Sequence, residues 1–139
     1  MSQFVFRAMS ALNAWLYRLS GGKVAGSMKG APILLLTTTG RKTGKTRVTP
    51  LLYLRDGENL VLVASKGGAP KHPVWFLNVE ANPDVGVEVG RTRERRRARR
   101  ATPEERERLW PKVVEMYGGY ADYQEKTTRE IPLAILEPA

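Results

Sequence analysis

Short β-type runs separated by glycine-containing turns constrain the fold of this chain more than any other feature. Gly40 and Gly44 mark the turn after the first run, and Asp56-Gly57 is a hairpin signal before the third. The first three runs are Ile33–Thr38, Arg47–Arg55 and Asn59–Ala64. Because short connections join these runs, they predict three strands of an antiparallel meander.

The remaining strands are expected around two helices. A short helix is expected to begin near Pro73 and to end at Asn82-Pro83, because the residue before a proline disfavours helical backbone. Thr102-Pro103-Glu104-Glu105 starts the other helix, with a capping threonine and a proline at the first position. The further strands are Val85–Val89, an edge strand over 92–101 and Ile131–Leu136. This pattern predicts a mainly β fold with helices (α+β), built as a small antiparallel barrel.

The first residues have the pattern of an amphipathic helix over 3–19. A narrow polar stripe at helical spacing consists of Gln3, Arg7, Ser10 and Asn13. The broad apolar surface packs against the domain's own sheet or, alternatively, contacts lipid headgroups. Arg7 interrupts the apolar run, which argues against a secretory signal and against a membrane span of about 20 apolar residues. We therefore expect an N-terminal amphipathic helix (1–22) and one barrel domain (23–139).

The charge of the chain favours anionic partners. The formal net charge is +9 and the pI is near 10.2, as expected for a protein that binds nucleic acid, an anionic membrane or a charged small molecule. The chain has no cysteine and a single histidine, His72. Disulfides and thiol nucleophiles are thereby excluded, and no metal site is expected. The absence of cysteine agrees with a reducing, cytoplasmic location.

The segment Thr37–Pro50, with the sequence TTTGRKTGKTRVTP, is expected to form a loop between two strands that holds a phosphate-bearing ligand. Glycines let the backbone approach closely, and arginine grips a phosphate with two parallel hydrogen bonds. The basic residues of the loop are Arg41, Lys42 and Lys45, and the expected contacts at the start of the next strand are Arg47, Thr49 and Pro50. The alternative is a solvated hairpin turn.

A second basic glycine loop follows another strand directly. Its residues are Ser65, Lys66, Gly67 and Gly68, and we expect it to meet the first loop at one end of the sheet. In the helix that comes next, Trp75 is placed to face a planar ligand and Asn78 to hydrogen-bond it. The alternatives are an ordinary turn for the loop and core packing for the aromatic ring.

Three tyrosines recur at three-residue intervals in a glycine-containing loop: Tyr117, Tyr120 and Tyr123. Phenol rings can wall an apolar pocket and offer protons to a ligand. Packing of these rings on the surface is the alternative.

Together these motifs resemble the deazaflavin-dependent nitroreductase family. The segments that carry the resemblance are TTTGRKTGKTRVTP, ASKGG, HPVWFLNVEANP, MYGGYADYQ and REIP, in this order between about Gly30 and Pro138. The resemblance implies a split β-barrel, like the flavin reductases and pyridoxamine-phosphate oxidases. It also implies coenzyme F420, a deazaflavin with a phosphate and a polyglutamate tail. Members pass a hydride from the reduced cofactor to nitroaromatics, quinones and other activated alkenes.

The resemblance also implies roles for individual residues. The phosphate-holding positions of the family match Arg41, Lys42 and Arg47. A loop beside the cofactor matches Ser65, Lys66 and Gly67, and the residues that line the cofactor match Pro73, Trp75 and Asn78. The substrate-side tyrosines match Tyr117, Tyr120 and Tyr123. The arginine run from Arg91 to Arg100 departs from what cofactor binding requires, and a solvated strand, a tail-binding surface and a membrane contact are its alternative explanations.

The leading hypothesis is therefore an F420-dependent reductase with a small-molecule hydride acceptor, in which positioning supplies most of the catalysis. An FMN-binding split barrel is the second hypothesis. A nucleic-acid-binding module using the arginine run is the third, and we expect no nucleic-acid partner because no recognition motif accompanies the run. A quinone is the preferred acceptor, since the N-terminal helix would place the enzyme at the inner face of the cell membrane.

Overall fold

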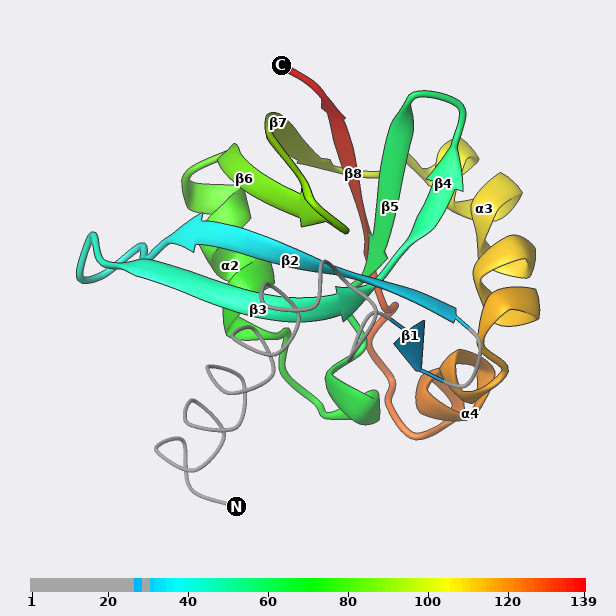
Figure 1. The fold of residues 1–139 in the computed structure, drawn as a ribbon. Coiled ribbons are helices and arrows are strands. Elements are labelled where there is room, and N and C mark those ends of the chain that lie inside the picture. Colours follow the sequence, from blue (N-terminus) through cyan, green and yellow to red (C-terminus); the bar gives the residue numbers. More distant parts are fainter. Residues whose placement is uncertain (1–26, 29–30) are drawn as a thin grey trace.

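One curved antiparallel sheet forms the body of the computed structural model, which describes residues 27–28 and 31–139 (Figure 1). The helix expected over 3–19 lies outside these residues. The strands are β1 (Ser27–Met28), β2 (Ala31–Thr39), β3 (Thr46–Leu52), β4 (Leu54–Asp56), β5 (Asn59–Val63), β6 (Asp84–Val89), β7 (Thr92–Arg100) and β8 (Leu133–Pro138). Their order is β1-β2-β6-β7-β8-β5-β4, and β3 pairs with the other side of β2. The mainly β, split-barrel prediction is confirmed.

Two of the helices begin at or next to the residues predicted from the sequence, and one further helix, after Met116, was not predicted. The helical elements are a 3-10 turn, η1 (Lys66–Gly68), and the α-helices α2 (Val74–Ala81), α3 (Pro103–Met116) and α4 (Gly119–Glu125). At the start of α3 the Thr102 hydroxyl accepts from the Glu105 N–H at 3.2 Å. The Glu105 carboxylate accepts in return from the Thr102 N–H at 2.9 Å. This reciprocal pair is the capping box predicted from the sequence.

The predicted strand Arg47–Arg55 is broken at Tyr53, so the middle strand of the expected meander is divided into β3 and β4, while its antiparallel pairings with the strands before and after it are present. The Tyr53 N–H donates to the Pro32 carbonyl at 3.1 Å, and the side chain is buried in the core. The chain bends at this point, and β4 pairs with β5 while β3 stays on β2. The second neighbour of β5 is β8, the last strand of the chain.

The predicted edge strand over 92–101 is a central strand, so this prediction is wrong. β7 pairs with β6 on one side and with β8 on the other. The strand tolerates this position because acidic neighbours match its charge: five of its arginines form ion pairs, namely Arg93, Arg96, Arg97, Arg99 and Arg100. Most of the run is thus paired with acidic side chains of the fold.

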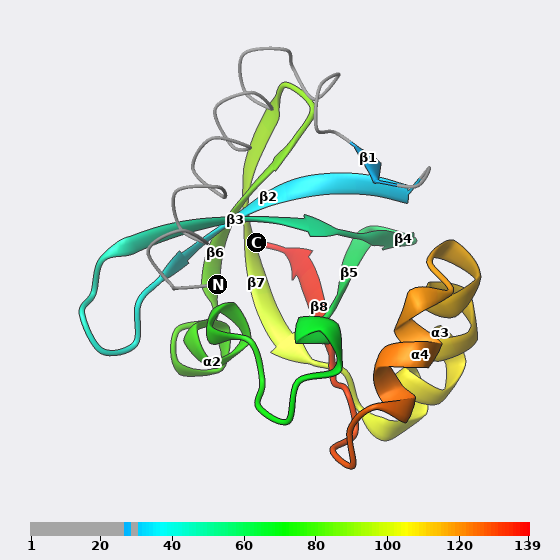
Figure 2. The ribbon, with the colours of Figure 1, turned by 90° about the horizontal axis from the view of Figure 1, so that it is seen from below.

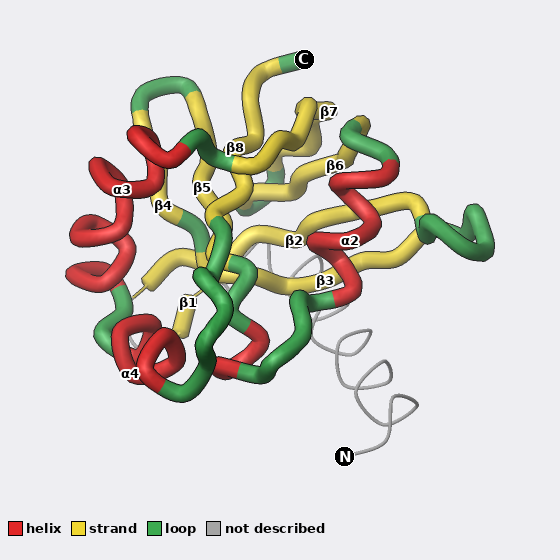
Figure 3. The backbone as a smooth tube through the Cα atoms, turned by 180° about the vertical axis from the view of Figure 1, so that it is seen from behind, coloured by secondary structure: helices red, strands yellow, loops and turns green. Residues whose placement is uncertain are grey.

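The core lies on both faces of the sheet. Leu60 and Leu62 of β5 pack in a cluster with Phe76 of α2. Val61, one residue along, packs in a second cluster that includes Leu109 of α3. The alternation places α2 and α3 on opposite sides of β5, as the view from behind shows (Figure 3). β5 is therefore buried on both of its faces.

Candidate functional site

The loop between β2 and β3 has the build of an anion site. The Gly40 N–H donates to the Lys45 carbonyl and the Gly44 N–H to the Gly40 carbonyl, each at 2.8 Å. Gly44 has a φ of 71°, a backbone conformation that glycine adopts without steric cost. Arg41, Lys42 and Lys45 are exposed, and none of them forms an ion pair within residues 27–28 and 31–139. The cationic turn therefore stays free to receive an anion.

A hydrogen bond fastens this loop to α2. The Asn78 side-chain oxygen accepts from the Arg41 backbone N–H at 3.1 Å. Asn78 is buried, with 3% of its surface exposed, so the anchor is shielded from water. Two of the predicted site residues are thereby brought together, and the contact orients the loop through its backbone.

The register of β2 and β3 places the ligand contacts predicted on β3 on two different faces of the sheet. Arg47 pairs with Thr38 and Thr49 with Leu36, whereas Pro50 pairs with Leu35. Opposite residues of an antiparallel pair share a face, so Arg47 and Thr49 lie on the face of the buried Leu36. Pro50 lies on the other face. The structure brings Arg47 and Thr49 together and leaves Pro50 apart.

Thr38 adds a feature that the sequence did not single out. Its hydroxyl oxygen is buried and has no hydrogen-bond partner in the described part of the chain. An unpaired buried hydroxyl is costly unless a water or ligand satisfies it. Its place opposite Arg47, on the same face, makes it a candidate donor to a bound ligand. No pattern in the sequence marks one threonine among several as orphaned.

The second loop is bent into an unusual conformation. Lys66, Gly67 and Gly68 have φ values of 45°, 62° and 82°, all in the left-handed region that glycine favours. Lys66 and Gly67 are exposed and Ser65 is half-buried. Gly68 is buried and lies close against α4. A Cβ added at this position would lie only 2.6 Å from the Tyr123 carbonyl oxygen. The loop thus presents Lys66 and Gly67 outward while Gly68 seats it on the helix.

The two basic loops do not meet. Figures 1 and 2 show α2 between the β2–β3 loop and η1. Pro73 and Trp75 at the start of α2 are buried, and the Trp75 ring packs edge-on against Phe76 with centroids 5.8 Å apart. Trp75 is therefore mainly a core residue. A ligand that touches both loops has to extend along α2.

The three tyrosines form one cluster where α3 ends and α4 begins. The sequence predicted a loop here, but Tyr120 and Tyr123 lie on α4, because the glycines sit at the start of the helix and do not interrupt it. The ring centroids of Tyr117 lie 5.0 Å from Tyr120 and 6.2 Å from Tyr123. Gly119 makes this possible, since a Cβ there would lie 2.5 Å from the Tyr117 ring. The three phenol rings therefore lie together.

Two phenols of the cluster have raised pKa values. The hydroxyls of Tyr117 and Tyr123 are 3.2 Å apart and share a hydrogen bond, which raises the pKa of Tyr123. Burial raises the pKa of Tyr120, which is 5% exposed. All these effects favour the neutral phenol at neutral pH. The side chains are therefore suited to donate hydrogen bonds and not to act as bases.

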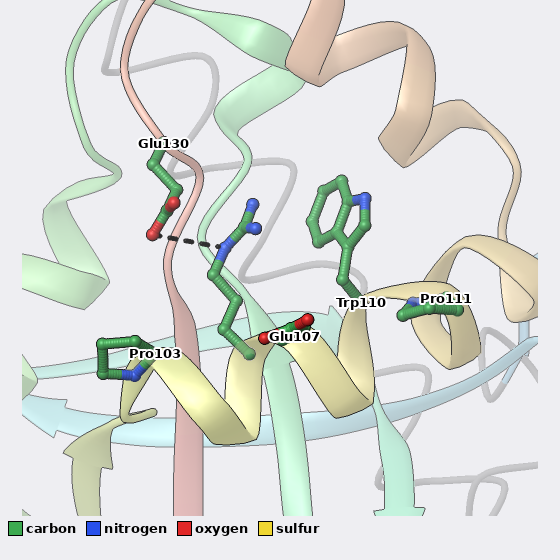
Figure 4. Close-up of a pocket in the computed structure, with 6 residues that line it drawn as sticks. Pro103, Glu107, Trp110, Pro111 and Glu130 are labelled. Atoms are coloured by element: carbon green, nitrogen blue, oxygen red, sulfur yellow. Dashed lines mark ion pairs between the residues drawn. The ribbon is translucent and has the colours of Figure 1, made fainter.

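An open hollow outside α3 contains none of the predicted site residues (Figure 4). The Arg106 guanidinium lies 4.4 Å from the centroid of the Trp110 ring and pairs with Glu130 at 3.6 Å. This ion pair joins α3 to the segment before β8. The hollow is lined by residues of α3 and by Glu130, and by no residue of the two loops or of the tyrosine cluster.

The arrangement defines a class of protein. A split barrel with a cationic glycine turn at one end of α2 and a protonated phenol cluster beside a second glycine loop is typical of an oxidoreductase that binds an anionic redox cofactor. Residues 9–138 match the family described as F420H(2)-dependent quinone reductase. The chain belongs to this family, whose hydride donor is reduced coenzyme F420. The predicted resemblance and the predicted cofactor are confirmed, and the FMN hypothesis is set aside.

Individual relatives agree with this assignment. The chain is 43% identical to the F420H(2)-dependent quinone reductase Rv1261c of Mycobacterium tuberculosis, over 87% of this chain and 84% of the relative. A solved F420-H2 dependent reductase (FDR-A) is 50% identical, with a TM-score of 0.71, and covers 76% of this chain and 94% of its own. A structure described as a domain-swapped dimer is 43% identical with a TM-score of 0.73, covering 94% and 99%.

Proposed function

We propose that this chain transfers a hydride from reduced F420 to a quinone, and that nitroaromatics and activated enones are further acceptors. The observation that carries the proposal is the seating of the second glycine loop on α4, the helix that carries Tyr120 and Tyr123. Gly68 of that loop lies directly against the Tyr123 backbone, so the helix of the tyrosines lies beside the segment expected to border the cofactor. The family name supports the quinone.

The residues of the chain fit this cofactor. F420 carries a phosphate and a carboxylate tail, and the β2–β3 loop offers the exposed cations Arg41, Lys42 and Lys45. Arg47, Thr49 and the orphaned Thr38 hydroxyl share one face beside that loop. We assign the phosphate to Arg41 and Lys42, with Arg47 and Thr49 as neighbours, and Lys45 to the tail. Charge-assisted hydrogen bonds of this kind are stronger than neutral ones.

The middle and far end of the cofactor are assigned to the other predicted residues. Asn78 orients the first loop through the Arg41 backbone, and Pro73 and Trp75 form the buried start of α2 along which the ligand extends. Ser65, Lys66 and Gly67 border the ring system, and Gly68 holds that loop on α4. When bound, reduced F420 supplies the hydride, so the chain itself needs no nucleophile.

The tyrosines orient the acceptor. In a shared hydroxyl pair such as Tyr117 and Tyr123, one hydrogen lies between the two oxygens, and the pair can pass a second hydrogen bond to an acceptor oxygen. A quinone carbonyl gains negative charge as it receives a hydride, so a donor there stabilises the transition state. Tyr120 is too buried to contact the acceptor, and its ring packs against the other two rings. Neutral phenols suit this role and supply a proton if the acceptor requires one.

The test is a survey of acceptors. The oxidation of reduced F420 is followed by absorbance with menadione, a nitroimidazole and a cyclic enone, with and without the protein. We expect turnover with all three and the highest kcat/KM with menadione. Oxidation no faster than in the protein-free control with every acceptor would refute the proposal. Binding of oxidised F420 is measured separately by fluorescence quenching, and we expect an affinity in the low micromolar range or tighter.

We further propose that the enzyme is cytoplasmic and works at the inner face of the cell membrane. The support is the polar stripe of residues 3–19, which has the pattern of an interfacial helix. Within the described residues, no helix is both long and apolar enough to cross a bilayer. The test compares the full chain with a variant lacking residues 1–20 for association with anionic liposomes. Equal association of the two proteins would refute this role for the helix.

A further inference from the structure

The Arg129 side chain binds the segment that carries the second glycine loop at four points. Nε donates to the Ala69 carbonyl at 2.9 Å and Nη2 to the Ser65 carbonyl at 2.8 Å. Nη1 donates to the Ala64 carbonyl at 3.2 Å and lies 3.0 Å from Nδ1 of His72. One planar fork thus gathers acceptors from both ends of the loop, which a single ammonium group could not do.

The backbone of Arg129 is itself held in place. Its carbonyl accepts from the Gln124 side-chain amide at 2.8 Å, and the other side of that amide accepts from the Ile131 N–H at 2.9 Å. Arg106 of α3 reaches the same Gln124 oxygen at 3.1 Å. Because Gln124 lies on α4, the guanidinium connects the tyrosine helix to the loop.

The loop is of the kind that requires an external anchor. Its three residues with positive φ include a lysine, for which the left-handed region is unfavourable. The carbonyls on each side of this bend are turned toward Arg129. The Ser65 carbonyl also accepts from the Gly68 N–H at 2.9 Å, and the guanidinium adds a charged donor at this carbonyl and at those of Ala64 and Ala69.

The contact with Arg129 determines the tautomer of His72. A guanidinium has only donors, so Nδ1 of His72 accepts and the ring proton is on Nε2. The ring is further held edge-on to Phe76, with centroids 5.3 Å apart. Arg129 therefore fixes both ends of the stretch that leads from the loop into α2.

We propose that Arg129 is a positioning residue that holds the Ser65–His72 segment in the conformation that receives F420. The inference rests on the proposed function for its cofactor, and on geometry alone for its effect on the loop. Arg129 touches no reacting group and acts through Lys66 and Gly67. In the sequence, Arg129 is part of the REIP motif. No sequence pattern indicates that it contacts residues 64–72.

The test compares Arg129→Lys and Arg129→Met with the wild type, and Arg97→Lys serves as the matched control. Arg97 is exposed and pairs across the β6–β7 ladder, at 3.5 Å from Asp84, so this control removes one guanidinium at constant charge. Hydrogen–deuterium exchange of peptides covering residues 64–72 is measured without cofactor. KM for reduced F420 and kcat with menadione are measured in parallel.

Both Arg129 variants are expected to exchange faster over residues 64–72, while peptides from β2 and β6 stay as in the wild type. In Arg129→Lys we expect KM for reduced F420 to rise about tenfold, the effect of losing one ordinary hydrogen bond, with kcat within about twofold. Arg97→Lys should match the wild type in both measurements. If Arg129→Met does not fold, Arg129→Lys alone decides.

Two results would overturn the inference. Unchanged exchange over residues 64–72 in Arg129→Lys would show that the guanidinium does not hold the loop. Faster exchange with an unchanged KM would show that the loop conformation does not matter for the cofactor. Failure of the wild type itself to bind F420 would refute the proposed function and the cofactor part of this inference, whereas the exchange experiment would still report on the loop.

Discussion

Replacement of Gly68 by alanine should loosen the junction between the second loop and α4. A Cβ at this position would lie 2.6 Å from the Tyr123 carbonyl oxygen and 3.1 Å from its Cα. Both are backbone atoms, so the contact can be relieved only by moving the loop or the helix. Gly68 also has a φ of 82°, a value that strains alanine whatever the space available.

Gly67→Ala separates the two effects. Gly67 has a φ of 62° and no atom within 4 Å of an added Cβ, so this variant has the backbone strain without the collision. The strain costs about 1–2 kcal/mol in either variant. Overpacking adds about 1–3 kcal/mol in Gly68→Ala alone. At roughly 4 °C per kcal/mol for a chain of this size, Gly68→Ala should melt about 4–12 °C below Gly67→Ala.

Thermal unfolding followed by far-UV circular dichroism measures this difference. The tyrosine cluster gives a second readout, because displacement of α4 should raise the KM for menadione in Gly68→Ala more than in Gly67→Ala. Equal melting temperatures for the two variants would refute the claim that Gly68 is required by its contact with α4.

Three further predictions concern the helix cap, the histidine and the cationic loop. Thr102→Ala removes the capping box of α3 and should lower the free energy of unfolding by about 1 kcal/mol, as measured by urea denaturation with Thr102→Ser as the control. Burial and the neighbouring Arg129 and Arg100 lower the pKa of His72, whereas Glu80 raises it weakly. The single histidine should therefore titrate below pH 6.5 in a proton NMR experiment. Because its pKa is lower in the folded state, the stabilisation that His72 contributes is lost as the pH falls below about 6.5, and a pH-independent free energy of unfolding between pH 7 and 5 would contradict this. Arg41→Ala combined with Lys42→Ala should weaken F420 binding at least about tenfold and reduce its salt dependence; equal quenching curves for this variant and the wild type would contradict the phosphate assignment.

Local signals in the sequence predicted the elements of this fold well. The capping threonine at position 102, the hairpin glycine at 57 and the proline at 83 each act within a few residues of themselves, and the structure places a helix start, a turn and a helix end at these positions. The glycine turn between β2 and β3 is equally local. Its hydrogen bonds close within Gly40–Lys45, so no distant residue is needed to form it.

Contacts between segments that lie far apart in the chain were not predictable from local sequence signals. The identification of β7 as an edge strand was wrong because its second neighbour, β8, comes from the end of the chain. The break at Tyr53 depends on the Pro32 carbonyl, and the two basic loops are separated by a helix that has to pack between them. The family resemblance supplied the split barrel and the cofactor, which the periodicity of the strands alone left at the level of a small barrel.

The sequence by itself determined a mainly β chain with a cationic glycine turn, a second glycine loop and three regularly spaced tyrosines. These are properties of spacing, charge and backbone freedom. Only the tertiary structure decided that the second loop sits on the tyrosine helix through Gly68, that Asn78 anchors the first loop, and that Arg129 gathers the carbonyls of the second. Such contacts join residues that are far apart in the chain and depend on how strands and helices pack, because a hydrogen bond or a steric contact is set by distance in space.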